Sequence, residues 1–431
     1  MRALRAPGRS GSAYTLGPCG RQERSDKERI ATSTIEASRD VAHGEPPLYT
    51  RNFVLAAVTH FTGGMSTGMF ILYPLFLAGL GADELVIGQV MGLGAAAAVA
   101  TRPVAGHLLD VLGARRTLLW GGLVNLASIV LLIFVGAIGA QLLALTVLHA
   151  VAAGTLFASY FTYATHIVPP ERRIEGVAMF GVAGMLPNGL APPLSELLID
   201  RVGFGAYFGC AAGFSAVSLL LTLLLDDARG EHPAPVERAR ASAWLRLVAL
   251  PELRVVYLTT FLFGVGIAAL FTFLAPYAVA ARRGEVGGFF FAYAMSAIFT
   301  RVVGGRLPER LGPRRLLVPA LLAYAVGLAL TPFTATQPPL LALGAVCGAG
   351  HGYAFPILNV LAVARTPGHV RGAVVSLYTA MIDLGQMAGA PLLGAIAMRS
   401  FRAMFLTAAA ALVLAALAMR IADRPALVEE L

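Results

Sequence analysis

One carboxylate in the C-terminal half of this chain has the surroundings of a proton-binding site. Asp383 is embedded in a long apolar run, and Ser376, Thr379 and Gln386 lie around it at spacings that place all four on one face of a helix. An ionisable group at the centre of a bilayer costs at least about 2.5 kcal/mol, so such residues are usually functional. We expect this stripe to face a cavity and Asp383 to exchange a proton there. The alternative is a structural role, in which a neighbour on its own helix or Arg301 holds Asp383.

Three histidines also lie within apolar runs, at His60, His149 and His351. Histidine titrates near neutral pH and can carry a proton or hydrogen-bond a ligand. On a helix, Tyr160 and Tyr163 would share a face with His149. For each histidine taken singly, an equally good interpretation is a neutral ring that is hydrogen-bonded to a helix carbonyl.

The composition indicates what kind of element must position these residues. Of the 431 residues, 57% are hydrophobic and 13% are charged, whereas soluble domains carry about 25% charged residues. The net charge of +9 is spread over many short segments, which excludes a nucleic-acid-binding face. Cys19, Cys210 and Cys347 are isolated and form neither a disulfide framework nor a metal-binding spacing. We therefore predict an all-α polytopic membrane protein.

A polar segment recurs half a chain apart. TRPVAGHLLDVLGARR at residues 101–116 returns as TRVVGGRLPERLGPRR at residues 300–315, with nine identical positions at an offset of 199 (300 minus 101). Such an offset indicates an internal duplication. Each copy lies between apolar runs and is expected to form a short hairpin between two membrane helices. Asp110 is expected to face the positive end of a helix, and Arg115 and Arg116 are expected to lie beside anionic headgroups.

Four glycines recur within these two segments. We expect Gly106 and Gly305 to stand where helices approach closely, because glycine removes a side chain from the contact. We expect Gly113 and Gly312 to adopt the positive φ that ends a tight turn.

The first copy resembles the loop signature of the major facilitator superfamily, G-x-L-x-D-R-x-G-R-R, which stands here as Gly106, Leu108, Asp110, Gly113, Arg115 and Arg116. Val111 takes the place of the usual first arginine. In the second copy Glu309 replaces the aspartate and Arg310 restores the arginine, followed by Arg314 and Arg315. Pro169 to Gly181 and Arg371 to Gly394 are similar to the drug-efflux-like bacterial branch, which includes arabinose-efflux-type permeases.

The resemblance implies twelve transmembrane helices in two six-helix bundles related by the repeat, with a central site between them. The apolar runs that fit this fold lie near 52–79, 85–108, 116–137, 141–167, 176–199, 204–225, 255–281, 287–307, 315–334, 339–364, 372–397 and 403–421. The predicted organisation is a disordered cytoplasmic tail at 1–51, bundles at 52–225 and 255–422, a cytoplasmic linker at 226–254, and a C-terminal tail at 423–431.

Basic residues predict the orientation of these helices. With the N-terminus inside, only Arg201, Arg282, Arg283, Arg399 and Arg402 lie outside, which leaves 28 of the 33 Lys and Arg residues inside. Because cytoplasmic loops carry the excess of Lys and Arg, both termini are expected in the cytoplasm of a cell that carries the protein in its plasma or inner membrane.

Helices five and eleven are predicted to be the interrupted, kinked pair of the two repeats. They carry Pro187, Pro192, Pro193 and Pro391, of which the last aligns with Pro192 at the same offset. Helix five also resembles a weakened form of the Gly-Pro motif of proton-coupled exporters.

Three further charged residues stand near the predicted helix ends. Glu196 is expected to have a structural role at the outer interface. Arg102 and Arg301 occupy repeat-matched positions, which suggests a gate contact, although anchoring by snorkelling is the simpler interpretation.

The resemblance also implies which residues surround the central site, because helices one, four and ten line the cavity in this superfamily. With the stripe around Asp383, the expected substrate cavity comprises His60, His149, Tyr160, Tyr163, His351, Asn359, Thr379 and Gln386.

These features predict a secondary active transporter that works by alternating access. The expected activity is export of a small amphiphilic molecule in exchange for protons, with Asp383 as the proton carrier and without a cofactor. The main alternative is proton-coupled uptake of a sugar or organic acid, and a receptor-like protein without transport is a third class. The expected partners are a small-molecule substrate and the lipid bilayer, with the protein as a monomer.

An unrelated activity is suggested by Gly64-Met65-Ser66-Thr67-Gly68, which fits the nucleophile pattern G-x-S-x-G. That pattern needs a strand, a turn and a helix around the serine, whereas Ser66 lies within a predicted membrane helix. An intramembrane serine hydrolase is therefore the remote alternative. The sequence also lacks phosphate-binding and dinucleotide-binding fingerprints.

Overall fold

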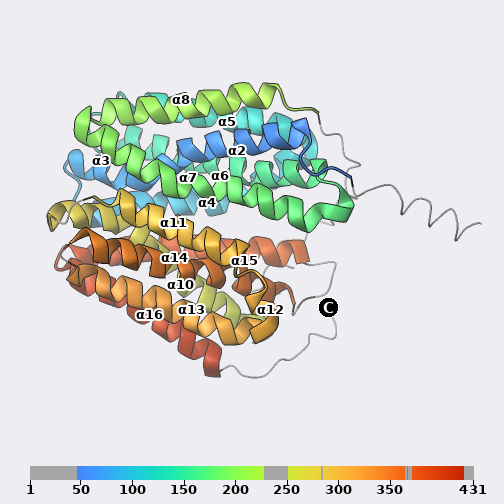
Figure 1. The fold of residues 1–431 in the computed structure, drawn as a ribbon. Helices are drawn as coiled ribbons and strands as arrows, with labels where there is room; N and C mark the ends of the chain where they lie inside the picture. Colours follow the sequence, from blue (N-terminus) through green and yellow to red (C-terminus); the bar gives the residue numbers. More distant parts are fainter. Residues whose placement is uncertain are drawn as a thin grey trace, which may run out of the picture. The chain divides into compact units, whose positions relative to one another are not determined.

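The computed structural model describes residues 46–227, 251–282, 285–334, 336–364, 366 and 371–421. The predicted N-terminal tail up to residue 45, most of the predicted linker and the predicted C-terminal tail lie outside these residues. Within the described part, the chain is built from long helices that run side by side (Figure 1).

The N-terminal half begins with a span that is broken once. The helices of this half are α2 (Arg51–Met69), η1 (Phe70–Leu72), α3 (Tyr73–Gly79), α4 (Glu84–Leu112), α5 (Ala114–Leu132), α6 (Ala140–Ile167), η2 (Pro170–Arg172), α7 (Arg173–Arg201) and α8 (Phe204–Leu223). Thr50 and Asp83 cap α2 and α4, since their side-chain oxygens accept hydrogen bonds from the Phe53 and Val86 amides.

The C-terminal half repeats the pattern with one extra short helix. Its helices are α10 (Pro251–Ala280), α11 (Gly287–Val302), α12 (Leu307–Leu311), α13 (Pro313–Leu330), η3 (Thr331–Phe333), α14 (Gln337–Val363), α15 (Arg371–Ala397) and α16 (Phe401–Ile421). Among the described residues, 11 spans have the length and apolarity to cross a membrane. The twelfth, α11, is 16 residues long, or about 24 Å, and completes the predicted set.

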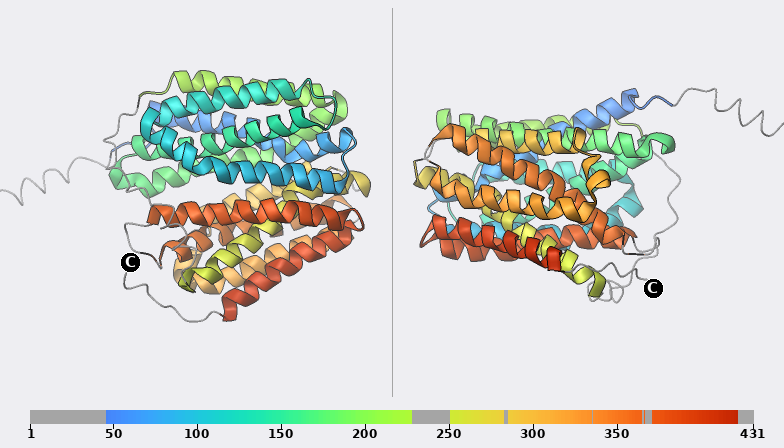
Figure 2. Two further views of the ribbon diagram at one scale, coloured as in Figure 1. Left: turned by 180° about the vertical axis from the view of Figure 1, so that it is seen from behind. Right: turned by 60° about the horizontal axis from the view of Figure 1, so that its bottom comes forward.

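Helix pairing within the two halves follows the duplication. The pairs α2–α7, α2–α8, α4–α6 and α5–α6 in the first half correspond to α10–α15, α10–α16, α11–α14 and α13–α14 in the second half. Two extensive pairs join the halves, α4 with α15 and α7 with α11, and Figure 2 shows these helices at the boundary between the blue-green and the yellow-red helices. The predicted fold of two six-helix bundles is confirmed.

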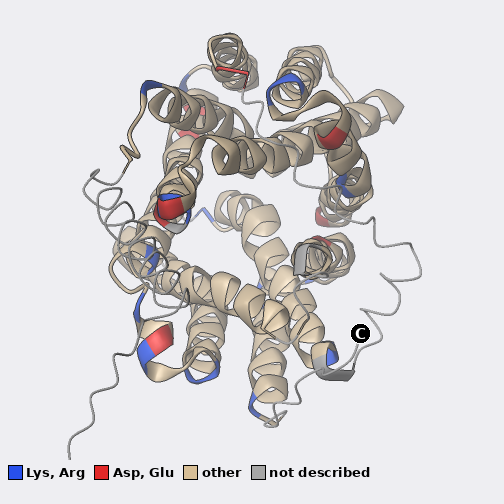
Figure 3. Cartoon of the chain, turned by 90° about the vertical axis from the view of Figure 1, so that its right-hand side faces the viewer, with Lys and Arg blue, Asp and Glu red and all other residues tan. Residues whose placement is uncertain are grey.

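The first copy of the duplicated segment is helical up to one turn residue, whereas the second copy has a further turn at residues 303–306, before α12. Helix α4 continues to Leu112, so the polar hairpin is reduced to Gly113, which has φ 77°, and Gly312 in the second copy has φ 87°. Both positive φ values were predicted. We call the end of the molecule that carries Gly113 and Gly312 the motif end and the other the opposite end. Figure 3 views the motif end along the helices and shows charged residues chiefly at helix ends.

The expectation of close helix contact at Gly106 and Gly305 is wrong. A methyl group at Gly106 would meet no atom within 4 Å, and at Gly305 it would meet the Arg301 carbonyl of the same turn. Gly106 lies within α4 and borders a cavity, so no neighbouring helix packs against it.

We predict opposite effects for alanine at two glycines of the motif. Gly113→Ala should lower the free energy of unfolding by about 1 kcal/mol, because a side chain disfavours its positive φ. Gly106→Ala should raise it by up to about 1 kcal/mol, because alanine favours a helix interior and the site is open. Thermal unfolding of the purified protein in detergent measures both, and equal shifts in the same direction would contradict the assignment.

Arg115 has a helix-capping role that differs from the predicted headgroup contact. Its guanidinium donates hydrogen bonds to the carbonyl oxygens of Leu223, at 2.8 Å, and Thr222, at 3.4 Å. Both carbonyls belong to the last turn of α8, where the negative end of the helix dipole lies. Arg115 therefore ties α5 to the end of α8.

Helices five and eleven are continuous in the structure, and the kinks expected at their prolines stay a prediction. Helix α7 is continuous through Pro187, Pro192 and Pro193, and α15 is continuous through Pro391. These prolines instead lie at helix contacts, where Pro187 faces Gly64, Pro193 faces Gly287 and Pro391 faces Gly92. The break occurs in the first span, where the 3-10 turn Phe70–Leu72 precedes Pro74.

Candidate functional site

Two cavities lie along the contact between α4 and α15, and Asp383 lines both of them. The first, of about 280 Å³, is bounded by α4, α6, α10, α15 and the broken first span, and we call it the mid-span cavity. The second, of about 380 Å³, reaches Gly106 and Leu109 near the motif end, and we call it the motif-side cavity. Asp383 is thus the carboxylate at the junction of the two spaces.

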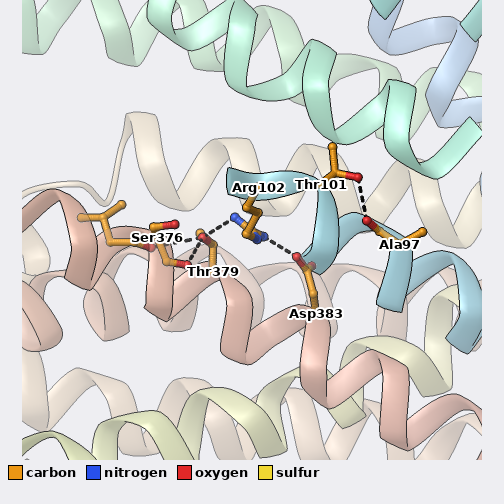
Figure 4. Close-up of polar contacts among 7 residues, drawn as sticks. Ala97, Thr101, Arg102, Ser376, Thr379 and Asp383 are labelled. Atoms are coloured by element: carbon orange, nitrogen blue, oxygen red, sulfur yellow. Dashed lines mark hydrogen bonds and ion pairs between the residues drawn. The ribbon is translucent and has the colours of Figure 1, made fainter. Parts of the chain in front are cut away.

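Asp383 forms an ion pair with Arg102, which comes from the other half of the molecule (Figure 4). The second terminal nitrogen of Arg102 donates a 2.6 Å hydrogen bond to the Thr379 hydroxyl, so the guanidinium spans one turn of α15. The Thr379 hydroxyl donates to the Ser376 carbonyl, at 2.9 Å. Arg102 and Asp383 keep 30% and 18% of their side-chain surface exposed, so the pair lies at the cavity wall and not in a sealed core.

The predicted stripe on α15 faces the cavities as expected. Ser376 and Thr379 line the motif-side cavity and Gln386 lines the mid-span cavity, with Asp383 between them. The partner of Asp383 is Arg102 and not Arg301, which corrects the structural alternative. Since Arg102 reaches across to α15, its role is an inter-bundle contact, and the simpler expectation of anchoring is wrong.

His149 is the one predicted histidine that lines a cavity. It borders the mid-span cavity beside Thr146, and its ring is stacked on Phe70 with centroids 3.5 Å apart. The Thr146 hydroxyl lies 2.8 Å from the Tyr73 hydroxyl in the same wall. Aromatic and small residues therefore shape this cavity, with Asp383 as its charged group.

His60, predicted to line the cavity, lies inside the first bundle. Its ring is stacked between Tyr160 and Phe180, at centroid distances of 4.6 and 4.7 Å, and it fills the space beside Gly184. The first span faces the cavity with its broken segment around Phe70 and Tyr73 and not with the turn that carries His60. The prediction for His60 is wrong for that reason.

Tyr160 and Tyr163, expected on the cavity face of α6, also lie elsewhere. The Tyr160 hydroxyl is 2.8 Å from the Ser218 hydroxyl, and the Tyr163 hydroxyl donates to Asn52, at 3.1 Å. His149 borders the mid-span cavity, but nearer the motif end the same side of α6 contacts α2 and α8, so the cavity role predicted for the two tyrosines is wrong.

His351 and Asn359, both on α14, lie outside the two cavities as well. His351 Nδ1 is 2.6 Å from the Tyr293 hydroxyl, and its ring is stacked on Phe355. Phe355 lines the motif-side cavity, so His351 lies one residue layer behind the wall. Both expectations are wrong.

The opposite end of the molecule is closed by glycine contacts. A methyl group at Gly88 in α4 would overlap the Ala390 carbonyl of α15, and one at Gly287 in α11 would lie 2.6 Å from Pro193 Cα in α7. Both pairs join the two halves. Close backbone contact at this end, together with a cavity that reaches the motif end, describes a state open toward the motif end.

Glu196 adds a polar contact to this closed end. Its carboxylate accepts hydrogen bonds from the amides of Val286, at 2.8 Å, and Gly287, at 2.7 Å, at the start of α11. In the first half, the corresponding helix α4 is capped at its N-terminus by Asp83, the residue directly before it. The residue before α11 makes no such hydrogen bond, and Glu196 of α7 caps α11 instead. Glu196 therefore holds the two halves together at the opposite end.

We predict that Glu196→Ala loosens the opposite end. Loss of the carboxylate removes bonds to a charged acceptor, each worth about 1.5–3 kcal/mol, so opening should become at least about tenfold more frequent. The measurement is the labelling rate of a cysteine at Val286, which is 1% exposed, by a membrane-impermeant thiol reagent. Asp200→Asn, at an exposed site of the same helix, is the control, and unchanged labelling in Glu196→Ala would contradict the role.

The sequence profile of the Major Facilitator Superfamily matches residues 54–285 and 256–430, which together span most of the chain. The chain belongs to this superfamily. It is a membrane transporter of the secondary active type and not an enzyme.

Two transporters and one solved transporter structure illustrate what this superfamily member is similar to. Multidrug resistance protein MdtG of Enterobacter lignolyticus is 26% identical over 84% of this chain and 90% of its own. Probable nitrate/nitrite transporter NarK2 of Mycobacterium tuberculosis is 28% identical over 64% of this chain and 71% of its own. The crystal structure of a peptide transporter POT in complex with sulfate superposes with a TM-score of 0.72 at 18% identity, over 88% of this chain and 95% of that one.

Ser66 and the cysteines have structural positions in this transporter. The Ser66 hydroxyl is fully buried in α2 and accepts a hydrogen bond from Asn125, at 3.2 Å, and membership of a transporter superfamily excludes the hydrolase alternative. Cys210 and Cys347 are free thiols. Within the described ranges, no group of three His, Cys, Asp or Glu side chains could hold a metal ion.

Sequence reasoning missed the aromatic wall of the mid-span cavity. Phe70, Tyr73 and Phe271 line it together with Thr272. An available signal was Pro74 within the first apolar run, since a proline inside a helix ends or distorts it and re-aims the side chains around it.

Proposed function

We propose that the protein exports a small amphiphilic molecule in exchange for protons, with Asp383 as the proton carrier. The observation that carries this proposal is a half-buried carboxylate at the junction of two cavities, paired with a cation from the opposite bundle. Membrane-embedded carboxylates in transporters mark proton and substrate routes.

The ion pair between Asp383 and Arg102 couples protonation of Asp383 to the contact between the two bundles. When Asp383 is ionised, it binds Arg102 and joins α15 to α4 at the junction of the two cavities. Protonation removes the negative charge of Asp383, so the ion pair is replaced by a weaker hydrogen bond from the Arg102 cation to a neutral carboxylic acid. Loading and release of a proton therefore change how firmly the two bundles are held, which is what coupling requires.

The walls of the cavities support an amphiphilic ligand. Phe70, Tyr73 and Phe271 offer aromatic surface, while Thr146, Thr379 and Gln386 offer hydrogen bonds. Apolar walls with a few polar groups are typical of sites for small organic molecules.

The direction of transport is supported by one relative and by charge. MdtG, which matches most of the chain, is named a multidrug resistance protein. The excess of Lys and Arg on the loops of the motif end favours a cytoplasmic position for that end. A cavity open toward the motif end is then a loading state for export, with both termini in the cytoplasm.

Accumulation in cells tests this proposal. Cells that express the protein should retain less of a labelled amphiphile from a panel of apolar drugs, sugars and organic acids than cells that express Asp383→Asn. A protonophore should abolish the difference. Higher accumulation in the wild-type cells would instead establish uptake, and no difference for any compound would contradict transport through Asp383.

A further inference from the structure

The two repeat-matched arginines have different partners. Arg102 and Arg301 are separated by the repeat offset of 199 (301 minus 102), and each reaches the helix of the other bundle that packs on its own, α15 for Arg102 and α7 for Arg301. Arg102 finds Asp383 there. Arg301 donates to the thioether of Met185 at 2.6 Å, which is a weak acceptor.

The repeat shows what is missing beside Arg301. The position that corresponds to Asp383 is Gly184 (383 minus 199), and the position that corresponds to Thr379 is Phe180. A side chain at Gly184 would overlap the ring of His60, so the space is filled by a histidine in place of an acid. The anion that neutralises Arg102 therefore has no equivalent at Arg301.

The surroundings of Arg301 do not compensate its charge. Its guanidinium carbon lies 5.5 Å from the centre of the Phe355 ring, and its Nε is buried without a hydrogen-bond partner. Throughout the part of the chain that the structure describes, no Asp or Glu forms an ion pair with Arg301. A half-buried guanidinium without a counter-charge is costly, and an anion that binds beside it removes that cost.

The location of Arg301 connects this charge to the transport route. Phe355 lines the motif-side cavity, and Arg301 lies against the face of its ring. The other charges at this cavity, Arg102 and Asp383, neutralise each other. Arg301 itself lies behind the Phe355 ring and outside the cavity lining, so its positive charge is separated from a ligand in the cavity by this one side chain.

We infer that Arg301 binds the anionic group of the transported molecule, and that the molecule is an amphiphilic organic anion such as a carboxylate. The inference rests on the proposed function for the route of the ligand. A planar carboxylate matches the fork of a guanidinium and would supply in trans the group that Asp383 supplies to Arg102. The apolar part of the ligand then lies in the aromatic cavity.

The first experiment measures binding without transport. Thermal unfolding of the purified full chain in neutral detergent is followed with 4-phenylbutyrate, its neutral isostere 4-phenylbutanamide, and the cation 4-phenylbutylamine. The carboxylate should raise the Tm, and the amide and amine should not. Equal stabilisation by the carboxylate and the amide, or none by the carboxylate, would overturn the inference.

Substitutions at two positions assign the effect to Arg301. Arg301→Gln should weaken binding of 4-phenylbutyrate at least about tenfold, since a charge-assisted hydrogen bond is lost. Met185→Glu should do the same by placing a competing carboxylate on an intact Arg301, whereas the matched Met185→Gln should bind like the wild type. Unchanged binding in Met185→Glu or in Arg301→Gln would contradict the assignment.

A lipid headgroup is the other source of an anion. Phosphatidylglycerol added in place of 4-phenylbutyrate would stabilise the wild type but not Arg301→Gln if a headgroup occupied the site, and inactivity of 4-phenylbutyrate alongside that result would overturn the ligand proposal. Asp83→Asn, which lies outside both cavities, should bind 4-phenylbutyrate like the wild type. If the wild-type protein bound 4-phenylbutyrate but exported no compound, the proposed function would be contradicted while the assignment of Arg301 as an anion site would hold.

Discussion

Asp383→Asn is expected to abolish net proton-driven transport while leaving exchange of labelled for unlabelled ligand intact. The amide has the shape of the carboxylic acid and still accepts a hydrogen bond from Arg102, but it cannot carry a proton. Exchange needs only the binding site and the movement of the bundles, so it should persist. Proteoliposomes with and without a pH gradient measure the two activities side by side.

The control for this variant is Asp83→Asn. Asp83 caps α4 outside the cavities, and Asn caps helices about as well as Asp. It should retain both activities. Net transport by Asp383→Asn at the wild-type rate would show that another group carries the proton.

Gly88→Leu is expected to stop the transport cycle by a different route. Even a methyl group at Gly88 would overlap the backbone carbonyl of Ala390, which cannot move aside as a flexible side chain would. The closed opposite end then becomes strained by about 1–3 kcal/mol, which lowers its population by roughly fivefold to a hundredfold. Both net transport and exchange should fall, because each requires the two bundles to close at this end.

Whether the opposite end is closed or open in this variant can be measured by thiol labelling. A cysteine at Ala390, which is 1% exposed, should react slowly with a membrane-impermeant thiol reagent in the wild type and quickly in Gly88→Leu. Gly209→Leu is the matched control, since Gly209 is exposed and has no atom within 4 Å of an added methyl group. Normal transport by Gly88→Leu would show that this glycine contact is not part of the cycle.

Periodicity predicted which residues share a helix face but not what each face meets. The α15 stripe around Asp383 was predicted correctly because one helix face lines both cavities along its length. The same reasoning failed for Tyr160 and Tyr163, because their part of the α6 face contacts α8 and α2 and borders neither cavity. His60 and His351 were predicted to line the cavity because histidine can bind a proton or a ligand, but both rings are packed against aromatic side chains instead.

The central contact could not be derived from one sequence. Arg102 and Asp383 are 281 residues apart, and the duplication pointed to Arg102 and Arg301 as a pair without showing which of them meets an acid. The fold was more accessible, since apolar length and the repeated glycines at 113 and 312 fixed the spans and their turns.

The central claim is that ligand and proton cross in opposite directions through Asp383. The most direct measurement records labelled ligand and internal pH together in one preparation of proteoliposomes under an imposed pH gradient. The account predicts ligand movement against proton movement in the wild type and neither in Asp383→Asn. Movement of both in the same direction, or equal coupled flux in the variant, would contradict it.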